Sequence, residues 1–192
     1  MRKKRIGLWI VSAIGLTCIL LAIYPIVHPA QNSIMLESEQ SNPHGAMYSL
    51  DLTENTTGTL VAERWENGKK TVSDPVAINP DSKQIQLYAT RQDEGIMVQL
   101  GVENGDTVMQ RFDYPEGKTA IGEAFATIVP EKKTILKPEQ GLILAALTPD
   151  FAGKGVFAMS CDMLTTNPSL LEEAPFLVVF RLVINDPSTA AH

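Results

Sequence analysis

Apolar and polar residues alternate along several short stretches of the chain. The alternation is clearest over residues 48–52, 84–90 and 96–102. Successive side chains of a β-strand point to opposite faces of a sheet, so this spacing predicts strands with one buried and one outward face. Short sequences that tolerate a positive φ separate the strand-like runs, as tight hairpins require. These turn sequences are Asn67-Gly68, Asp93-Glu94-Gly95 and Asn104-Gly105.

The later half of the chain contains continuous apolar runs. Residues 142–147 read Leu-Ile-Leu-Ala-Ala-Leu, and residues 176–184 are apolar except for Arg181. Runs of this length predict strands that are covered on both faces and lie centrally in a sheet. We expect Arg181 to face the rim of the domain or a buried acid. A single helical turn is predicted at residues 168–173, with Asn167 as its cap.

Cys161 lies in a segment, residues 156–164, for which the pattern predicts a strand. On such a strand it would share an apolar face with Phe157, Met159 and Met163. An apolar face and the neighbouring Asp162 both disfavour the thiolate, so we expect a buried, unreactive thiol. The alternative is a reactive or intermolecular cysteine.

Short strands with turn signals every eight to twelve residues predict an all-β fold. We expect an antiparallel β-sandwich of the immunoglobulin-like or a related type, with a barrel as the alternative. The domain is assigned to residues 47–186, and residues 187–192 are expected to fray. No repeat and no second domain boundary is visible in this part of the chain.

An uncharged apolar run covers residues 6–27 and follows four basic residues within residues 1–5. Because about 20 apolar residues span the hydrocarbon core of a bilayer, the run predicts a transmembrane signal-anchor helix. Positive residues stay on the cytoplasmic side, so the five-residue tail is expected inside the cell and the C-terminal domain outside. The bilayer is therefore the first expected partner, through residues 6–27.

Two alternatives to a retained anchor remain open. A cleaved signal peptide would end after Ala30, although His28 occupies the position where a small residue is expected. A lipoprotein would use Cys18, although Thr17 precedes it in place of a small residue. Residues 28–46 are rich in polar residues, proline and glycine, and we expect them to form a flexible tether. Its short apolar cluster at residues 34–36 is expected to dock on the domain.

The charge of the chain differs sharply between its two parts. All 22 acidic residues follow residue 30, whereas four of the 16 basic residues precede residue 6. The remaining 12 basic residues against 22 acidic ones leave a net charge of −10 outside the membrane. An acidic domain gains nothing from neutralising phosphates, which argues against nucleic acid and anionic lipid headgroups as its partners.

Residues that would carry catalysis or bind a metal are scarce. The three histidines are His28 at the membrane edge, His44 in the expected tether and His192 at the last position. A nucleophile needs a base held within about 3 Å, and a zinc site needs more His and Cys ligands than the domain offers. We therefore assign no catalytic, cofactor-binding or metal-ligating residue and expect no cofactor and no enzymatic activity.

Pairs of acidic residues are candidates for the catalytic carboxylates of a hydrolase or for the ligands of a calcium ion. Asp93-Glu94 and Glu172-Glu173 are adjacent in sequence, so their side chains diverge on a strand or a helix and do not face each other across a cleft. Asp74, Asn79 and Asp81 are candidates for a calcium-binding loop. Solvated turn residues explain them more simply.

The sequence therefore favours a non-catalytic interaction or assembly module of the cell envelope. It would be held near the membrane and bind an unknown protein or envelope partner through a sheet edge or hairpin tips. Trp65 and Tyr114 either flank such a surface or act as packing partners. The alternatives are a membrane-tethered hydrolase acting on envelope material and a secreted protein with a cleaved leader. A pocket of converging acids would favour the hydrolase, and a flat or edge-exposed surface would favour the interaction module.

Overall fold

Two antiparallel β-sheets contain most of the residues that the structure describes. This computed structural model describes residues 33–42, 44–52, 56–128, 134–135, 141–153 and 159–185. All of them belong to one unit of the chain, which begins at Asn32.

Sheet A has the strand order β10-β1-β2-β6-β7-β8, with every neighbouring pair antiparallel. Its strands are β1 (Ser33–Asn42), β2 (Gly45–Leu52), β6 (Gln84–Gln92), β7 (Gly95–Val102), β8 (Thr107–Asp113) and β10 (Thr134–Ile135). Sheet B has the order β4-β3-β12-β11-β9, and β5 also pairs with β3. Its strands are β3 (Gly58–Glu66), β4 (Lys69–Val72), β5 (Val76–Ile78), β9 (Gly122–Thr127), β11 (Leu142–Asp150) and β12 (Leu177–Ile184).

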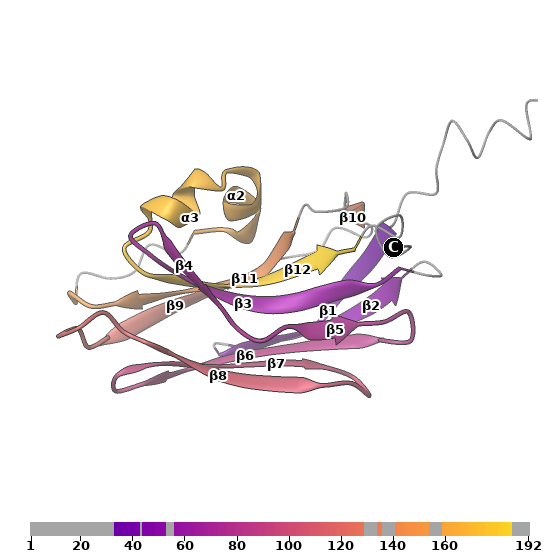
Figure 1. Cartoon of the computed structure of the whole chain (residues 1–192), viewed down its shortest axis with the longest axis horizontal. Coiled ribbons are helices and arrows are strands. Elements are labelled where there is room, and N and C mark those ends of the chain that lie inside the picture. Colours follow the sequence, from indigo (N-terminus) through magenta and orange to yellow (C-terminus); the bar gives the residue numbers. More distant parts are fainter. Residues whose placement is uncertain are drawn as a thin grey trace, which may run out of the picture. The chain divides into compact units, whose positions relative to one another are not determined.

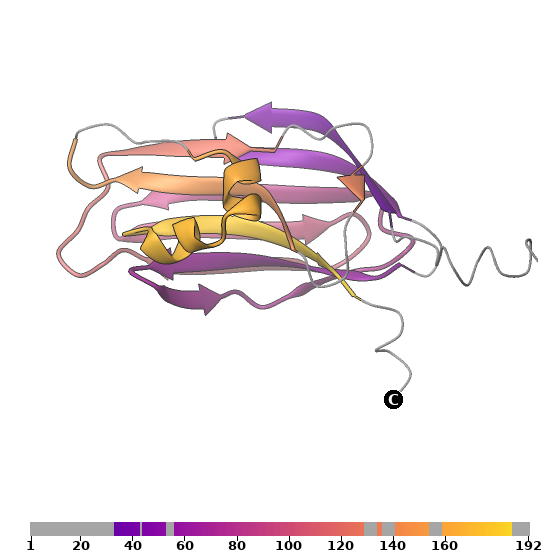
Figure 2. The same ribbon diagram turned by 90° about the horizontal axis from the view of Figure 1, so that it is seen from above.

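The two sheets form two layers with the hydrophobic core between them (Figure 1). Strands β3 and β5 of sheet B contact β7 of sheet A across this core. Helices α2 (Cys161–Thr166) and α3 (Ser169–Glu173) lie over the other face of sheet B, as the view from above also shows (Figure 2). Burial of both faces explains why β11 and β12 consist of nearly continuous apolar residues.

Tyr48 links the two layers through its hydroxyl group. The side chain is fully buried, and the hydroxyl donates to the carbonyl of Leu144 at 2.8 Å, with a longer contact to the carbonyl of Ile128 at 3.4 Å. The pairing of β11 with β12 shifts between Ile143 and Ala145, so Leu144 is the extra residue of a β-bulge. A bulge leaves its extra residue without a partner on the strand from which it is displaced. Here the carbonyl of Leu144 accepts from the backbone N–H of Ile128 at 2.9 Å as well as from Tyr48.

Most of the predicted strands and turns are confirmed. Residues 48–52, 84–90 and 96–102 lie within β2, β6 and β7, and the chain is all-β with antiparallel pairing. The predicted central strands, β11 and β12, each lie between two neighbours. Asn67 and Asn104 adopt φ values of 47° and 56° at the two predicted hairpin turns, and Gly68 has a φ of 79°.

The strand predicted for residues 156–164 is wrong in its second half, because residues 161–166 form helix α2. Ser160 caps this helix by accepting a hydrogen bond from the backbone N–H of Met163 at 3.2 Å. The helical turn places Met163 in solvent, whereas Cys161 is buried. The helix predicted at residues 168–173 is confirmed as α3, although its cap position is Pro168 and no side chain supplies a capping bond.

The tether predicted for residues 28–46 is wrong for residues 33–42, which form β1, and the sheet therefore begins before residue 47. Composition suggested a chain that cannot bury enough to fold, but β1 is stabilised by backbone pairing with β2 along its whole length. The predicted cytoplasmic tail (1–5), membrane helix (6–27) and frayed C-terminus (187–192) lie outside the described residues. Within the described ranges, no helix is both long and apolar enough to cross a bilayer.

Candidate functional site

The outward face of sheet A is an open surface that the strand register builds from adjacent strands. Tyr88 on β6 is opposite Gln99 on β7, which is opposite Met109 on β8. Their sequence neighbours Leu87, Val98 and Leu100 are buried in the core, so this row points the other way. The flanking rows carry the rest of the face. Together these side chains, here called the outer face of sheet A, are Met47, Gln86, Tyr88, Thr90, Met97, Gln99, Thr107, Met109, Arg111 and Asp113.

This face carries almost no net charge, although charged residues make up 20% of the chain. Its charged residues are Arg111 and Asp113, both on the edge strand β8. Arg111 Nη2 contacts Glu94 Oε2 at 2.9 Å, and Arg111 Nε contacts Asp113 Oδ1 at 2.7 Å. The guanidinium is thus neutralised by carboxylates of the same molecule, and the rest of the face offers only amide, hydroxyl, thioether and aromatic groups.

No described element covers the outer face of sheet A, whereas α2 and α3 cover the corresponding face of sheet B (Figure 1). Met109 is 65% exposed, more than any other large hydrophobic side chain in the described part of the chain. Cores of protein interfaces are depleted in charge and enriched in Tyr, Met and Arg. The composition of this face therefore matches an interface better than it matches an ordinary solvated surface.

Tyr88 owes its position to a glycine on the neighbouring strand. It is paired with Gly45 on β2, and a Cβ at Gly45 would come within 2.4 Å of Tyr88 Cδ1. The ring therefore lies over the bare backbone of Gly45 and keeps the face flat at this point. A flat, uncharged sheet surface suits contact with another flat surface more than it suits enclosure of a small molecule.

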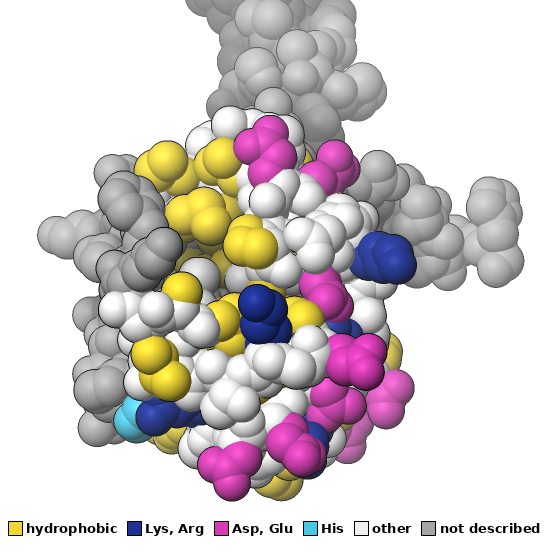
Figure 3. Space-filling view, turned by 90° about the vertical axis from the view of Figure 1, so that its left-hand side faces the viewer, with side chains coloured by type: hydrophobic (Ala, Val, Ile, Leu, Met, Phe, Trp, Pro, Cys, Tyr) yellow, Lys and Arg dark blue, Asp and Glu magenta, His cyan; other side chains and the backbone are white. Residues whose placement is uncertain are grey.

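An open pocket of about 300 Å³ lies beside this face, where β8 ends. Glu94, Asp113 and Glu116 are among its lining residues, together with Arg111 and Lys118. Figure 3 views the molecule from the left-hand side of Figure 1, and acidic side chains gather along the lower and right-hand margins of that end. The Glu94 and Asp113 side chains are largely exposed and share Arg111. A glycosidase needs one carboxyl kept protonated by burial and another free to act, which this pair does not provide.

Three aromatic rings, Tyr114, Phe151 and Phe176, pack against one another next to this pocket. Tyr114 packs edge-to-face against Phe151 and Phe176 with centroid distances of 5.1 and 5.7 Å. Burial, with a further contribution from the nearby Glu123 carboxylate, raises the pKa of Tyr114 to about 12. Tyr114 is therefore a neutral packing residue that also lines the inner side of the open pocket.

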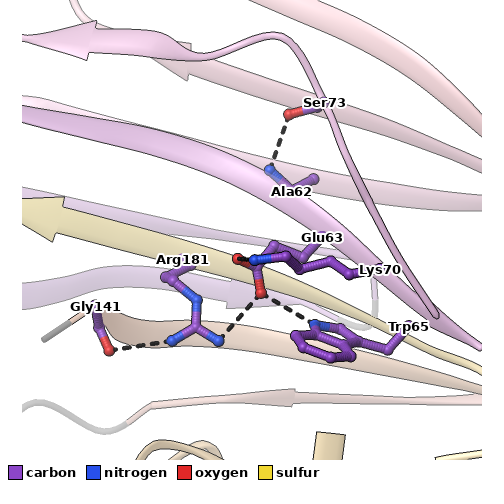
Figure 4. A network of polar contacts seen from close by, with 7 residues as sticks. All are labelled: Ala62, Glu63, Trp65, Lys70, Ser73, Gly141 and Arg181. Atoms are coloured by element: carbon purple, nitrogen blue, oxygen red, sulfur yellow. Dashed lines mark hydrogen bonds and ion pairs between the residues drawn. The ribbon is translucent and has the colours of Figure 1, made fainter. Parts of the chain in front are cut away.

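A charged network lies on the opposite sheet, next to the helices (Figure 4). Glu63 on β3 is buried, and its Oε2 accepts from Trp65 Nε1 at 3.0 Å and from Arg181 Nη2 at 3.1 Å. Lys70 on β4 lies 3.6 Å from Oε1 of Glu63, and its ammonium lies over the Trp65 ring. Arg181 Nη1 also contacts the carbonyl of Gly141 at 3.4 Å. The expectation that Arg181 faces a buried acid is confirmed.

This network joins strands and does not form a reactive centre. Oε2 of Glu63 accepts from Trp65 and Arg181, and Oε1 lies near Lys70, so the carboxylate is engaged by groups of its own sheet. The contacts link β3 to β4, β12 and the start of β11. Trp65 is thus a cross-strand packing partner of Lys70, its register neighbour.

The other residues considered from sequence do not form a site in the described structure. Burial, followed by the Asp162 carboxylate, raises the pKa of the Cys161 thiol to about 12, which supports an inert thiol. His44 lies in the turn between β1 and β2, with its Nδ1 3.2 Å from Glu123 Oε1. Among the described residues, no three His, Cys, Asp or Glu side chains gather as metal ligands, and the loop of Asp74, Asn79 and Asp81 is no exception.

Sequence reasoning missed the outer face of sheet A, although its signal was present. The alternation predicts which residues of each strand are buried, whereas the residues of this face occupy the other, outward set. In β6 and β7 that other set reads Gln86, Tyr88, Thr90, Met97 and Gln99, without one charge. Which strands lie side by side decides whether such residues form one surface, and the single sequence did not contain that order.

Comparison of the chain with family models, curated proteins and solved structures finds no match.

Proposed function

We propose that this protein is a membrane-anchored, extracytoplasmic interaction module of the cell envelope that binds a partner through the outer face of sheet A. The observation that carries the proposal is the open, nearly uncharged surface formed by four adjacent strands. Exposed polar surfaces of acidic domains ordinarily carry charge for solubility. A face with little net charge contributes little to solubility. Its composition fits contact with another macromolecule.

The anchoring part of the proposal is supported by the sequence. The uncharged run at residues 6–27, preceded by four basic residues, fits a helix that holds the domain on the outer side of the membrane. The mass of the mature N-terminus tests this part by itself. A retained Met1 or Arg2 is expected, and a chain that starts near Gln31 would contradict the anchor.

We also propose that the two layers are a β-sandwich of the immunoglobulin-like or a related type. Its support is the stacking of two antiparallel sheets on one core and the repeated passage of the chain between them, from β2 to β3, from β5 to β6 and from β8 to β9. Such a sandwich presents its outward sheet faces, edges and loops to partners while its core stays closed.

A photo-crosslinking amino acid at Gln99 tests the binding face directly. Gln99 lies in the central row of the face, on β7. The full chain that carries the probe is irradiated in intact cells, and the products are separated by mass. We expect a discrete adduct larger than the protein itself.

Val72 provides the matched control position. It lies on β4 of sheet B and is 43% exposed, so a probe there is also open to solvent. We expect no discrete adduct from position 72. Equal labelling at positions 72 and 99, or no adduct at position 99, would contradict the proposal.

A further inference from the structure

We propose that the edge strand β8 binds an extended, basic segment of a partner protein, which adds one more strand to sheet A. This inference rests on the proposed function, because the added strand continues the outer face of sheet A beyond β8. It follows from the direction of the backbone groups of β8, from the way the other sheet edges end, and from the side chains along the strand.

Every second residue of β8 points its backbone groups away from the sheet. The pairing of β8 with β7 is one-to-one along the whole strand, and the N–H of Tyr114 donates to the carbonyl of Glu94 at 2.8 Å just beyond it. Bonded and non-bonded pairs alternate along an antiparallel ladder, so the register assigns the outward-pointing N–H and C=O groups. They belong to Thr107, Met109, Arg111 and Asp113. No described strand pairs with this side of β8.

The other sheet edges are less open to an added strand. β4, β5 and β10 have four, three and two residues, and β4 begins with Lys69 and Lys70. Short strands and lysines are features by which native sheets prevent edge pairing. On β9, the remaining edge, Glu123 contacts His44 at 3.2 Å, which places a turn of sheet A beside that edge. β8 has seven residues without lysine, proline or a bulge against β7, so it lacks these features.

The inward side of β8 leaves apolar surface for the segment to cover. Val108 and Gln110 point towards the core but are only half-buried, whereas Val98 and Leu100 on the neighbouring strand β7 are fully buried. The cover of the core therefore thins at this edge. Apolar side chains on the inward face of an added strand would bury Val108 further, and removal of apolar surface from water favours binding.

The outward side of β8 defines the charge of the segment. Arg111 is paired with Glu94 and Asp113 of its own molecule, so these three side chains together carry one negative charge. The side chain of Asp113 is 72% exposed. Side chains on adjacent strands interact directly, so a basic residue beside Asp113 and an apolar residue beside Met109 match the strand. The excess of acidic residues after residue 30, 22 against 12 basic ones, also attracts a basic segment.

Proline at an outward-pointing position tests the backbone contact. It removes one outward N–H and adds a ring there, while the bonds of β8 to β7 remain. In the full chain with the photo-crosslinking amino acid at Gln99, Met109→Pro is expected to lower the adduct in intact cells at least tenfold. Met109→Ala removes the same side chain but keeps the N–H, and the adduct is expected to stay within twofold. Thr107→Pro against Thr107→Ala repeats the comparison at the first residue of β8, where strands tolerate proline.

A reversed charge tests the basic character of the segment. Asp113→Lys is expected to lower the adduct at position 99 at least fivefold, because two positive charges then lie side by side. Asp74→Lys, at an exposed position between β4 and β5, makes the same change of charge on sheet B and is expected to stay within twofold. Equal losses from the two substitutions would overturn the basic residue beside Asp113.

The outcomes separate this inference from the proposed function. An adduct at position 99 that neither proline lowers relative to alanine would overturn strand addition and leave the binding face standing. A photo-crosslinking amino acid at Thr107 is expected to give an adduct that Met109→Pro removes, and this result without an adduct at position 99 would leave strand addition standing and contradict the face. No adduct at either position would overturn both. An adduct of twice the mass of the chain would make a second copy the occupant and overturn the partner protein.

Discussion

Three buried side chains with polar groups hold parts of the domain together at the scale of single residues. Tyr48 bonds to a carbonyl on the opposite sheet, Glu63 binds two cations and an indole N–H within sheet B, and Cys161 is buried as a neutral thiol at the start of α2. A buried polar group costs free energy unless it finds partners, so each of these positions is sensitive to substitution. The sequence predicted the burial of Cys161 and the acid near Arg181. It gave no sign of the bond from Tyr48, because that bond depends on how the two sheets pack.

Tyr48→Phe tests the bond between the layers. The substitution removes the hydroxyl that donates to Leu144 at 2.8 Å, while the Leu144 carbonyl keeps its bond from the backbone N–H of Ile128. We expect the free energy of unfolding to fall by about 1 kcal/mol, measured by urea denaturation. Tyr88→Phe on the outer face is the control, with a change below about 0.5 kcal/mol. Equal effects of the two substitutions would show that the bond across the core contributes nothing.

Cys161 predicts how stability depends on alkaline pH. Burial raises the pKa of its thiol from 9.0 to about 12 in the folded state, so above pH 9 the unfolded chain loses a proton that the folded chain keeps. The free energy of unfolding is therefore expected to fall as the pH rises from 9 towards 12. Cys161→Ala should flatten the first part of this fall, before Tyr114 and Tyr48 contribute above pH 10. An unchanged slope in the variant would contradict the assignment.

Secondary-structure elements divide into those that local pattern determines and those that depend on partners. The alternating strands and the hairpins at Asn67 and Asn104 follow from side-chain period and turn chemistry, and these were predicted. Helix α2 was missed because an apolar segment of this length also fits a strand, and Ser160 was not recognised as a cap. Strand β1 was missed because its stability comes from pairing with β2, which composition does not report.

The ion pair between Glu63 on β3 and Arg181 on β12 is the clearest energetic link between two elements. Glu63→Leu would leave the partly buried Arg181 guanidinium without its carboxylate, and we expect a loss of about 3 kcal/mol in the free energy of unfolding. The double variant Glu63→Leu with Arg181→Met should cost less than the sum of the two single changes. Lys70→Met, on the exposed side of the network, should cost less than about 1 kcal/mol. Additive single effects in a urea denaturation series would show that the pair is not coupled.

At the scale of the whole molecule, the two sheets have different surroundings. Helices α2 and α3 cover sheet B, and the ion pairs of Glu63 link its strands β3, β4 and β12. Sheet A presents an open face with little net charge (Figure 1). The sequence was sufficient to predict the all-β class and the alternation of buried and outward residues along β2, β6 and β7. It was not sufficient to place β2, β6, β7 and β8 side by side in that order, and only this order turns scattered residues into one surface.

Cysteine labelling on intact cells tests most directly whether this surface is covered on the outside of the membrane. Met109→Cys and Val72→Cys are compared in full chains that lack Cys18 and Cys161, using a maleimide that does not cross membranes. Exposure in the single chain, 65% at Met109 and 43% at Val72, predicts faster labelling at position 109. The account predicts the opposite order on cells, with position 109 labelled several-fold more slowly until detergent releases the partner. Faster labelling at position 109 before detergent, or no labelling at either position until lysis, would contradict it.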